Sequence, residues 1–179
     1  MAHVKTPVGR VAYPNLHTPR KRNETAKPRF SITLVWPAGT DLSGVQKEID
    51  AVIAKKYPNG KPGNFRSPFR LGSEKRRDDG TLPAGFKEDD IFAEFWRYEE
   101  HGAAPIVDAG RAPIPASDVY AGCTARVLCN PFCYNRDGNK GTSLGLEAVQ
   151  KHEDGEKIGA APVDATQVFD SLDPDELPF

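Results

Sequence analysis

The stretch CTARVLCNPFCY, residues 123–134, decides the fold. Its residues alternate between two faces, as in a half-buried β-strand. One face carries Ala125, Val127 and Cys129, and the other carries Arg126, Leu128, Phe132 and Tyr134. The next seven residues, NRDGNKG, have the composition of a turn, and residues 142–150 form the return strand. The segment therefore predicts a β-hairpin.

Further strands are predicted on both sides of the helix described below. Residues 30–36, FSITLVW, alternate well, with Phe30, Ile32 and Leu34 on one face and Ser31 and Thr33 on the other. A shorter strand is expected over residues 8–13, ended by Pro14 and followed by a basic loop over residues 15–28. Residues 91–98 and a short edge segment, 105–109, complete the set.

One helix is predicted after the strand at residues 30–36. Asp41 is a plausible N-cap, and Val45, Ile49, Val52 and Ile53 form one apolar stripe before Pro58. Five or six short strands, one helix and Gly-rich turns predict a mainly β protein, an OB-type antiparallel barrel whose open face binds single strands. In the usual OB order the helix follows the third strand. Its place here predicts either an additional strand near the start or an elaborated barrel.

Charge is distributed unevenly along the chain. The whole chain has 24 Lys and Arg against 25 Asp and Glu, a formal net charge of −1. Five of the acids and no base lie in residues 160–179, so the remainder has 24 bases against 20 acids, a net +4. A basic body with an acidic end indicates a polyanionic partner for the body. Residues 1–158 are expected to form one domain, with residues 58–90 as a long basic loop, and residues 159–179 a disordered tail.

Aromatic residues interleaved with bases are the candidate contacts to nucleic acid, because every base can stack on a ring. The aromatic candidates are Tyr13, Trp36, Phe65, Phe69, Trp96, Tyr98, Phe132 and Tyr134. The basic candidates are Arg10, Arg20, Arg22, Lys27, Arg29, Arg66, Arg70, Lys75, Arg76, Arg77, Arg126 and Lys140. Lys21 and Arg136 are basic neighbours of the same aromatic residues. Phe30 and Phe95 are assigned to the core. The only predicted helix has a face of mixed charge, which argues against proteins that insert a basic helix into duplex DNA, such as helix-turn-helix proteins.

Other chemistries have weak support in the sequence. Cys123, Cys129 and Cys133 lack paired zinc spacing and fit buried structural cysteines. The four histidines are scattered in polar segments, and no P-loop spacing occurs. Asp89, Asp90 and Glu94 could form a two-metal nuclease site, although adjacent loop acids are more often solvated. We expect no enzyme activity and no cofactor. No signal peptide or membrane span is apparent, which predicts a cytoplasmic location.

The C-terminal end is the most distinctive motif. Acids precede a compact apolar terminus, formed by Asp173, Asp175, Glu176, Leu177, Pro178 and Phe179. This ending resembles the tails of bacterial single-stranded-DNA-binding proteins, which finish in acids followed by Ile-Pro-Phe. A flexible acidic segment with a terminal aromatic can insert that ring into a pocket of a partner protein. It can also compete with nucleic acid for the basic body.

Residues 120–150 resemble a family of tailed-phage proteins associated with the OB-fold single-stranded-DNA-binding protein of an Enterobacter phage. The resemblance rests on YAGC at 120–123, Arg126, NPFCY at 130–134, GNKG at 138–141 and LGLEAVQ at 144–150. RVAYPNL at 10–16 and the strand at 30–37 are also similar, so most of residues 8–159 is covered. The resemblance implies an OB barrel, DNA binding through a basic aromatic face, and a role in phage replication or recombination.

The leading hypothesis is a phage protein that coats single-stranded DNA without strong sequence preference, while its tail docks replication or recombination proteins. A second hypothesis is an interaction adaptor with weak affinity for nucleic acid, and a third is the metal-dependent nuclease. Association of copies, as a homo-oligomer or a cooperative filament on DNA, is compatible with the sequence, which leaves the oligomeric state open.

Overall fold

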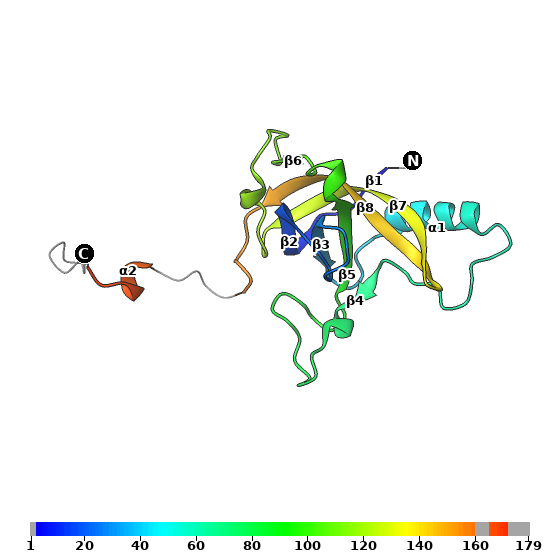
Figure 1. Cartoon of the computed structure of the whole chain (residues 1–179), viewed down its shortest axis with the longest axis horizontal. Coiled ribbons are helices and arrows are strands. Elements are labelled where there is room, and N and C mark those ends of the chain that lie inside the picture. The colour runs from blue at the N-terminus through cyan, green and yellow to red at the C-terminus, as the bar shows by residue number, and fades with distance from the viewer. Residues whose placement is uncertain (1–2, 160–164, 172–179) are drawn as a thin grey trace.

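Five strands close into a barrel in the computed structural model, which describes residues 3–159 and 165–171 (Figure 1). They are β2 (Gly9–Arg20), β3 (Arg29–Trp36), β5 (Ile91–Tyr98), β7 (Thr124–Arg136) and β8 (Asn139–Glu153). β3 pairs antiparallel with β2 and β5, β5 pairs parallel with β8, and β7 pairs antiparallel with both β8 and β2, which closes the circuit. A five-stranded circuit of mixed pairing is the OB-type barrel that the sequence predicts.

The predicted hairpin is confirmed, and both of its strands are longer than expected. β7 and β8 pair from Thr124 with Glu153 to Arg136 with Asn139. Only Asp137 and Gly138 remain in the turn, with φ of 50° and 83°. Two consecutive positive φ angles define a type I′ turn, whose twist matches that of the paired strands. The hairpin therefore projects beyond the barrel as a long two-stranded arm.

β2 differs from its prediction because it does not end at Pro14. The strand continues to Arg20 and pairs with β3 through two register shifts, one between Ala12 and Asn15 and the other between Asn15 and Arg20. Pro14 falls within the first shift, where it leaves no ladder hydrogen bond unmade. Tyr13, beside it, has φ of 46°, a left-handed conformation that is rare for an aromatic residue.

The helix is confirmed, and its place shows that the barrel is elaborated. α1 (Ser43–Lys56) lies between β3 and β5, the second and third strands of the circuit. The N-cap is Leu42 and not Asp41 as predicted, because the helix begins one residue later; Asp41 Oδ1 still accepts a hydrogen bond from the Ser43 amide at 3.0 Å, and Val45 and Ile49 are buried. β1 (Val4–Lys5) is a strand near the start, but it pairs only with β7, outside the barrel circuit.

The predicted long loop after α1 has more structure than expected. It contains β4 (Arg70–Leu71), which pairs with β5, and the 3-10 helix η1 (Gly72–Lys75). The Arg66 amide donates to the carbonyl of Lys140 at 3.0 Å, and the Thr142 amide donates to the carbonyl of Arg66 at 3.0 Å. The segment is therefore attached at β5 and at β8, and it forms a wall beside the barrel.

The barrel interior contains the apolar faces predicted from alternation. Ile32, Leu34, Phe95, Val127 and Leu146 are fully or almost fully buried there. Phe30 is also buried, as assigned. The remaining elements are short: η2 (Glu99–His101), β6 (Ile106–Val107), η3 (Ala116–Asp118) and α2 (Ala165–Val168). Among the residues described, no helix is long and apolar enough to cross a membrane.

Two of the three cysteines are buried in this interior, as expected. Cys123 and Cys129 are inaccessible to solvent. Burial raises the pKa of both thiols, that of Cys129 to about 12, so both remain protonated and unreactive at neutral pH. Cys133 is half-buried, with its Sγ 3.7 Å from the carbonyl oxygen of Val52 in α1.

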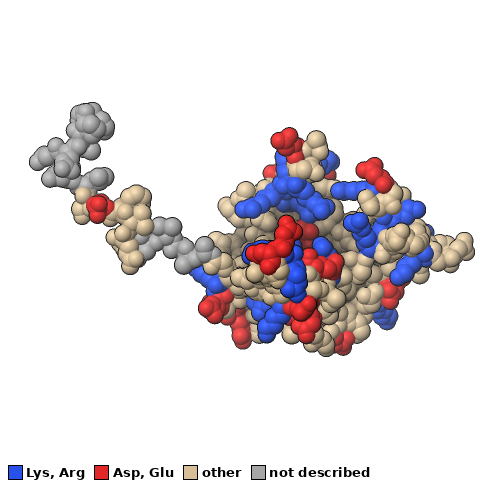
Figure 2. Space-filling view, turned by 90° about the horizontal axis from the view of Figure 1, so that it is seen from below, with Lys and Arg blue, Asp and Glu red and all other residues tan. Residues whose placement is uncertain are grey.

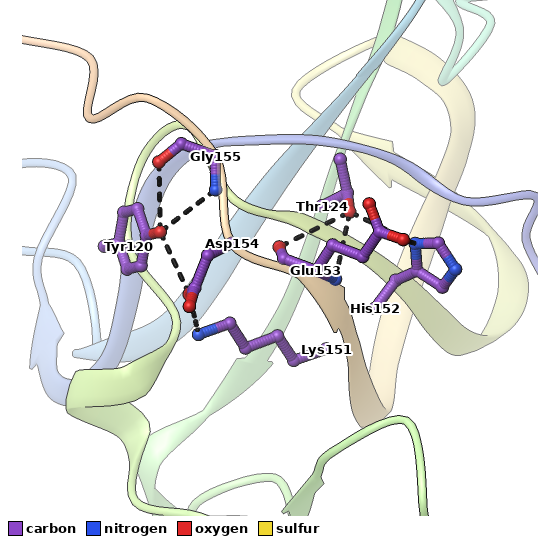
Figure 3. Close-up of polar contacts among 7 residues, drawn as sticks. All are labelled: Tyr120, Thr124, Lys151, His152, Glu153, Asp154 and Gly155. Atoms are coloured by element: carbon purple, nitrogen blue, oxygen red, sulfur yellow. Dashed lines mark hydrogen bonds and ion pairs between the residues drawn. The ribbon is translucent and has the colours of Figure 1, made fainter.

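The segment that follows β8 is attached to the barrel by a small polar cluster (Figure 3). The Tyr120 hydroxyl lies 3.0 Å from a carboxylate oxygen of Asp154 and accepts from the Gly155 amide at 3.0 Å. Lys151 Nζ lies 2.6 Å from the same carboxylate, which lowers the pKa of Asp154. Further along, the Ile158 amide donates to the carbonyl of Ala121 at 2.9 Å. The direction in which the chain leaves the barrel is therefore fixed up to Ile158.

Candidate nucleic-acid interface

The outer faces of β3 and β5 form the floor of a groove. Pairing of β3 with β5 sets Ser31 opposite Trp96 and Thr33 opposite Glu94. Side chains directly opposite each other in a sheet share a face, so these four residues point away from the barrel interior. Ser31 and Thr33 lie on the face predicted for them by the alternation of residues 30–36.

The groove has a volume of about 680 Å³ and is walled by three segments. The irregular part of β2 contributes Tyr13 and Asn15, and the hairpin contributes Phe132, Tyr134 and Arg136. The inserted segment contributes Arg66, Ser67, Pro68, Arg70 and Lys75. Figure 2 shows Lys and Arg side chains gathered around a hollow on one face of the molecule. Segments that lie far apart in the sequence thus meet along one open channel.

Three aromatic rings are packed edge to face at one end of the groove. The Trp96 ring centroid lies 5.0 Å from that of Tyr98 and 5.6 Å from that of Phe132, with interplanar angles of 73° and 78°. The indole Nε1 donates to Ser143 Oγ at 2.7 Å, and Arg136 donates to the Tyr98 hydroxyl at 2.8 Å. These contacts hold the rings in place while leaving all three half-exposed, so their faces can stack on bases.

Cations outnumber acids in the groove. Six basic side chains line it, Arg22, Arg29, Arg66, Arg70, Lys75 and Arg136, against the single carboxylate of Glu94. Arg29 Nη2 lies 2.6 Å from Glu94 Oε1, and its guanidinium lies 5.0 Å from the Trp96 ring centroid. Burial lowers the pKa of Arg29, and the carboxylate of Glu94 opposes that shift. An excess of positive charge beside exposed rings suits a strand of phosphates with its bases turned inward.

At the β2 edge, Lys75 joins two rings. Its Nζ lies 5.1 Å from the ring centroid of Tyr13 and 5.2 Å from that of Phe92. Tyr13 is 48% exposed and is stacked on Phe86 at 5.8 Å. Burial, and then the nearby cation of Arg70, lower the pKa of Lys75. The left-handed backbone at Tyr13 thus holds an exposed ring at the groove edge, a placement typical of functional sites.

Half of the predicted contact residues line this groove. They are Tyr13, Arg22, Arg29, Arg66, Arg70, Lys75, Trp96, Tyr98, Phe132, Tyr134 and Arg136. Lys27 lies close to its end, with Nζ 5.6 Å from the Tyr98 ring centroid. Arg20, Arg77 and Lys140 do not line the groove.

Trp36 corrects the aromatic prediction. It is completely buried, and its indole Nε1 donates to the carbonyl of Pro7 at 3.2 Å. It continues the alternation of Ile32 and Leu34, which places it in the barrel interior and out of reach of a base. Phe69 packs on Trp36 with ring centroids 6.2 Å apart, so it too belongs to the core side.

Other predicted contacts are engaged elsewhere, and none of them lines the groove. Phe65 packs edge to face on Tyr57 at 5.7 Å. Arg10 donates to the carbonyl of Gly85 and lies 3.6 Å from Asp90. Arg76 pairs with Glu88 at 2.8 Å, and Arg126 donates to Gln150 at 2.8 Å. These side chains stabilise loops and strand pairs.

The sequence reasoning missed several groove residues, which are mostly polar. They include Asn15, Ser67, Pro68, Phe92, Glu94, Asn139, Thr142 and Ser143. Alternation along β5 is the signal that could have found two of them, because Phe92 and Glu94 share a face with Trp96. The others come from the insertion, the hairpin and the register shift in β2, where alternation gives no guide.

Two of the three carboxylates considered for a nuclease site are engaged in other contacts, and the third, Asp89, is exposed. Asp90 is buried and accepts from the Lys87 amide at 2.8 Å, and Glu94 pairs with Arg29. Within residues 3–159 and 165–171, no three His, Cys, Asp or Glu side chains are grouped so that they could hold a metal ion. The six tail residues, 173 and 175–179, lie outside the described residues.

An OB-type barrel carrying a basic groove with half-exposed aromatic rings packed edge to face is the architecture of a protein that handles single-stranded nucleic acid. The chain belongs to the family of the Enterobacter phage Enc34 ssDNA-binding protein, whose sequence model matches residues 2–177. The family is therefore described by DNA binding and not by an enzyme activity. No curated protein sequence matches this one.

Solved structures of phage proteins share the fold. The single-stranded DNA-binding protein from bacteriophage Enc34 in complex with ssDNA is 19% identical, with a TM-score of 0.66 over 88% of this chain and 89% of that one. Another structure of the single-stranded DNA-binding protein from bacteriophage Enc34 is 21% identical, with a TM-score of 0.64 over 94% of this chain and 90% of that one. The gp2.5 single-stranded DNA binding protein encoded by bacteriophage T7 is 15% identical, with a TM-score of 0.61 over 88% and 94%.

Proposed function

We propose that this protein binds single-stranded DNA in the groove across β3 and β5, without strong sequence preference, and protects strands exposed in phage replication or recombination. The observation that carries the proposal is the cluster of Trp96, Tyr98 and Phe132 beside six basic side chains. Rings offer stacking to any base, and the cations neutralise phosphates, so affinity does not depend on reading base edges.

A titration of fluorescent oligo-dT and of a duplex of equal length, each at two salt concentrations, tests the proposal. We expect tighter binding of oligo-dT, with log K falling against log salt by about 0.7 for each phosphate neutralised. Tighter binding of the duplex, or affinity independent of salt, contradicts it.

The acidic C-terminal residues are proposed to dock replication or recombination proteins and to compete with DNA for the groove. The groove has a cationic excess, whereas residues 160–179 contain five acids and no base. Opposite charges attract most strongly at low salt, so competition is strongest there.

Deletion of residues 170–179 tests both parts of the tail proposal. We expect oligo-dT binding to tighten, with the largest gain at low salt, and docking of replication proteins to be lost. A matched variant with Asp170, Asp173, Asp175 and Glu176 changed to Asn or Gln keeps the length and removes the charge. Loss of DNA binding on deletion excludes competition. Weak binding before and after deletion favours the interaction adaptor.

A further inference from the structure

A second hollow, of about 480 Å³, adjoins the groove. It shares Trp96, Tyr98 and Phe132 with the groove and is completed by other residues, among them Arg97, Asn130 and Leu146. Its volume lies within the roughly 300–1,000 Å³ of small-ligand sites. The same three rings therefore border two hollows, so a strand lying in the groove passes beside this second one.

The polar side of the hollow is built by close packing of β7 and β8. Gly145 pairs with Asn130 on β7 and with Trp96 on β5. A Cβ at Gly145 would overlap Asn130 Oδ1, so the glycine is what allows the amide to lie against β8. Asn130 is 8% exposed. A polar side chain is thus set at the border of an otherwise largely apolar hollow.

Arg97 is held at the same hollow by backbone carbonyls. Its Nη2 donates to the carbonyl of His101 at 2.7 Å and its Nη1 to that of Leu146 at 3.4 Å. Its Nε is buried and has no hydrogen-bond partner within the described part of the chain. The two carbonyls use one N–H of each Nη atom, so each Nη keeps a second N–H that can donate to an occupant of the hollow.

We propose that this hollow is a subsite for one unstacked base of the single strand bound in the groove, an inference that rests on the proposed function. The ring wall of Trp96 and Phe132 stacks the base, and Arg97 and Asn130 provide hydrogen-bonding groups for its edge. Every base has ring acceptors and a π-face. The hollow adjoins the groove and shares its three rings, and Arg97 keeps N–H donors that an apolar side chain of a protein partner would leave facing carbon, so a base is the better occupant.

A set of single-residue variants tests the subsite with oligo-dT of increasing length. Arg97→Ala and Asn130→Ala change the hollow alone, and Asn130→Ala keeps every charge. Lys75→Ala changes the groove alone, and Lys47→Ala, on the exposed side of α1, removes a cation far from both. We expect Arg97→Ala and Asn130→Ala each to weaken binding of long oligonucleotides about tenfold, the scale of one hydrogen bond to the base edge. We expect no loss for oligonucleotides too short to reach beyond the groove, and none for Lys47→Ala.

A single 2-aminopurine moved along the oligonucleotide locates the base. One position should change fluorescence in the wild type, lose that change in Asn130→Ala, and keep it in Lys75→Ala. Circular dichroism melting shows whether each variant is folded. If Arg97→Ala does not fold, Arg97→Lys replaces it.

The two proposals fail in different ways. Failure of the wild type to bind oligo-dT overturns the proposed function and the subsite together. A different result overturns only the subsite: Lys75→Ala weakens binding, whereas Arg97→Ala and Asn130→Ala leave it unchanged at every oligonucleotide length. The hollow would then be left to a protein partner.

Discussion

At the scale of single residues, Trp96 is the centre of the interface. It contacts Tyr98 and Phe132 by ring packing, Arg29 by a cation–π contact, and Ser143 by a hydrogen bond. Its removal should therefore reduce stacking directly and loosen the rings on both sides.

The first prediction concerns Trp96→Ala. Loss of one stacked base should weaken the binding of oligo-dT by about 1–3 kcal/mol. The matched control is Phe65→Ala, which removes a half-exposed ring that packs on Tyr57 outside the groove. Fluorescence anisotropy with labelled oligo-dT measures both variants, and equal losses in the two would contradict the placement of the interface.

The second prediction concerns pH. Burial and the Arg70 cation lower the pKa of Lys75 below its usual 10.5, so as pH rises this lysine loses its charge before an exposed lysine does. Phosphate binds the charged form of Lys75, so affinity for oligo-dT should fall as the pH rises toward the lowered pKa of this lysine. Lys75→Arg stays charged and should retain affinity. Parallel affinity curves for wild type and Lys75→Arg across this pH range would exclude the role of Lys75.

At the scale of elements, two pieces added to the barrel form the groove. The insertion between β3 and β5 supplies one wall, and the projecting part of the β7–β8 hairpin supplies another. Arg66 joins the two, because its backbone bonds to Lys140 and Thr142 of β8 on both sides of Gly141. The walls are therefore held to each other as well as to the floor.

The third prediction concerns the charges on these walls. Arg66→Ala should reduce the slope of log K against log salt by about 0.7, the change for one phosphate contact on a single strand. Its backbone hydrogen bonds survive the substitution, so the wall should stay in place. Arg77→Ala, which removes an exposed cation outside the groove, should leave the slope unchanged. Titrations at four or more salt concentrations provide the slopes.

At the scale of the whole molecule, the start of the C-terminal segment is close to the groove edge. Ile158 lies against Gly85, and the next residue, Phe86, stacks on Tyr13. Gly122, with φ of 111°, fits beneath the carbonyl of Glu156, and a Cβ there would overlap that oxygen. This close packing sets where the chain leaves the barrel.

The fourth prediction concerns that packing. Gly122→Ala should cost about 1–3 kcal/mol from its backbone conformation alone, and more from the overlap with Glu156. The thermal midpoint should fall, and residues 154–158 should become accessible to protease and to hydrogen exchange. Gly44→Ala, in α1 with open space around it, is the control and should be neutral or slightly stabilising. An unchanged exchange rate at residues 154–158 would show that Gly122 does not hold this segment.

The sequence by itself determined the elements whose signal is local. Alternation predicted β3 and the hairpin, and it set Ser31 and Thr33 outward. Phe95, on the predicted strand at residues 91–98, was assigned to the core from its residue type. The apolar stripe predicted α1. The prediction for Trp36 was wrong because residue type was weighed above position, since its place in the alternation of β3 already assigned it to the core.

Only the tertiary structure decided which side chains meet. The parallel pairing of β5 with β8 brings Trp96 next to Phe132, and the insertion brings Arg66 next to Gly141. A periodic pattern reports which face of its own strand a residue occupies. It carries no record of which strand lies alongside, because closure of the barrel depends on pairings between segments far apart in the chain. The groove, and the hollow beside it, exist only once that closure is made.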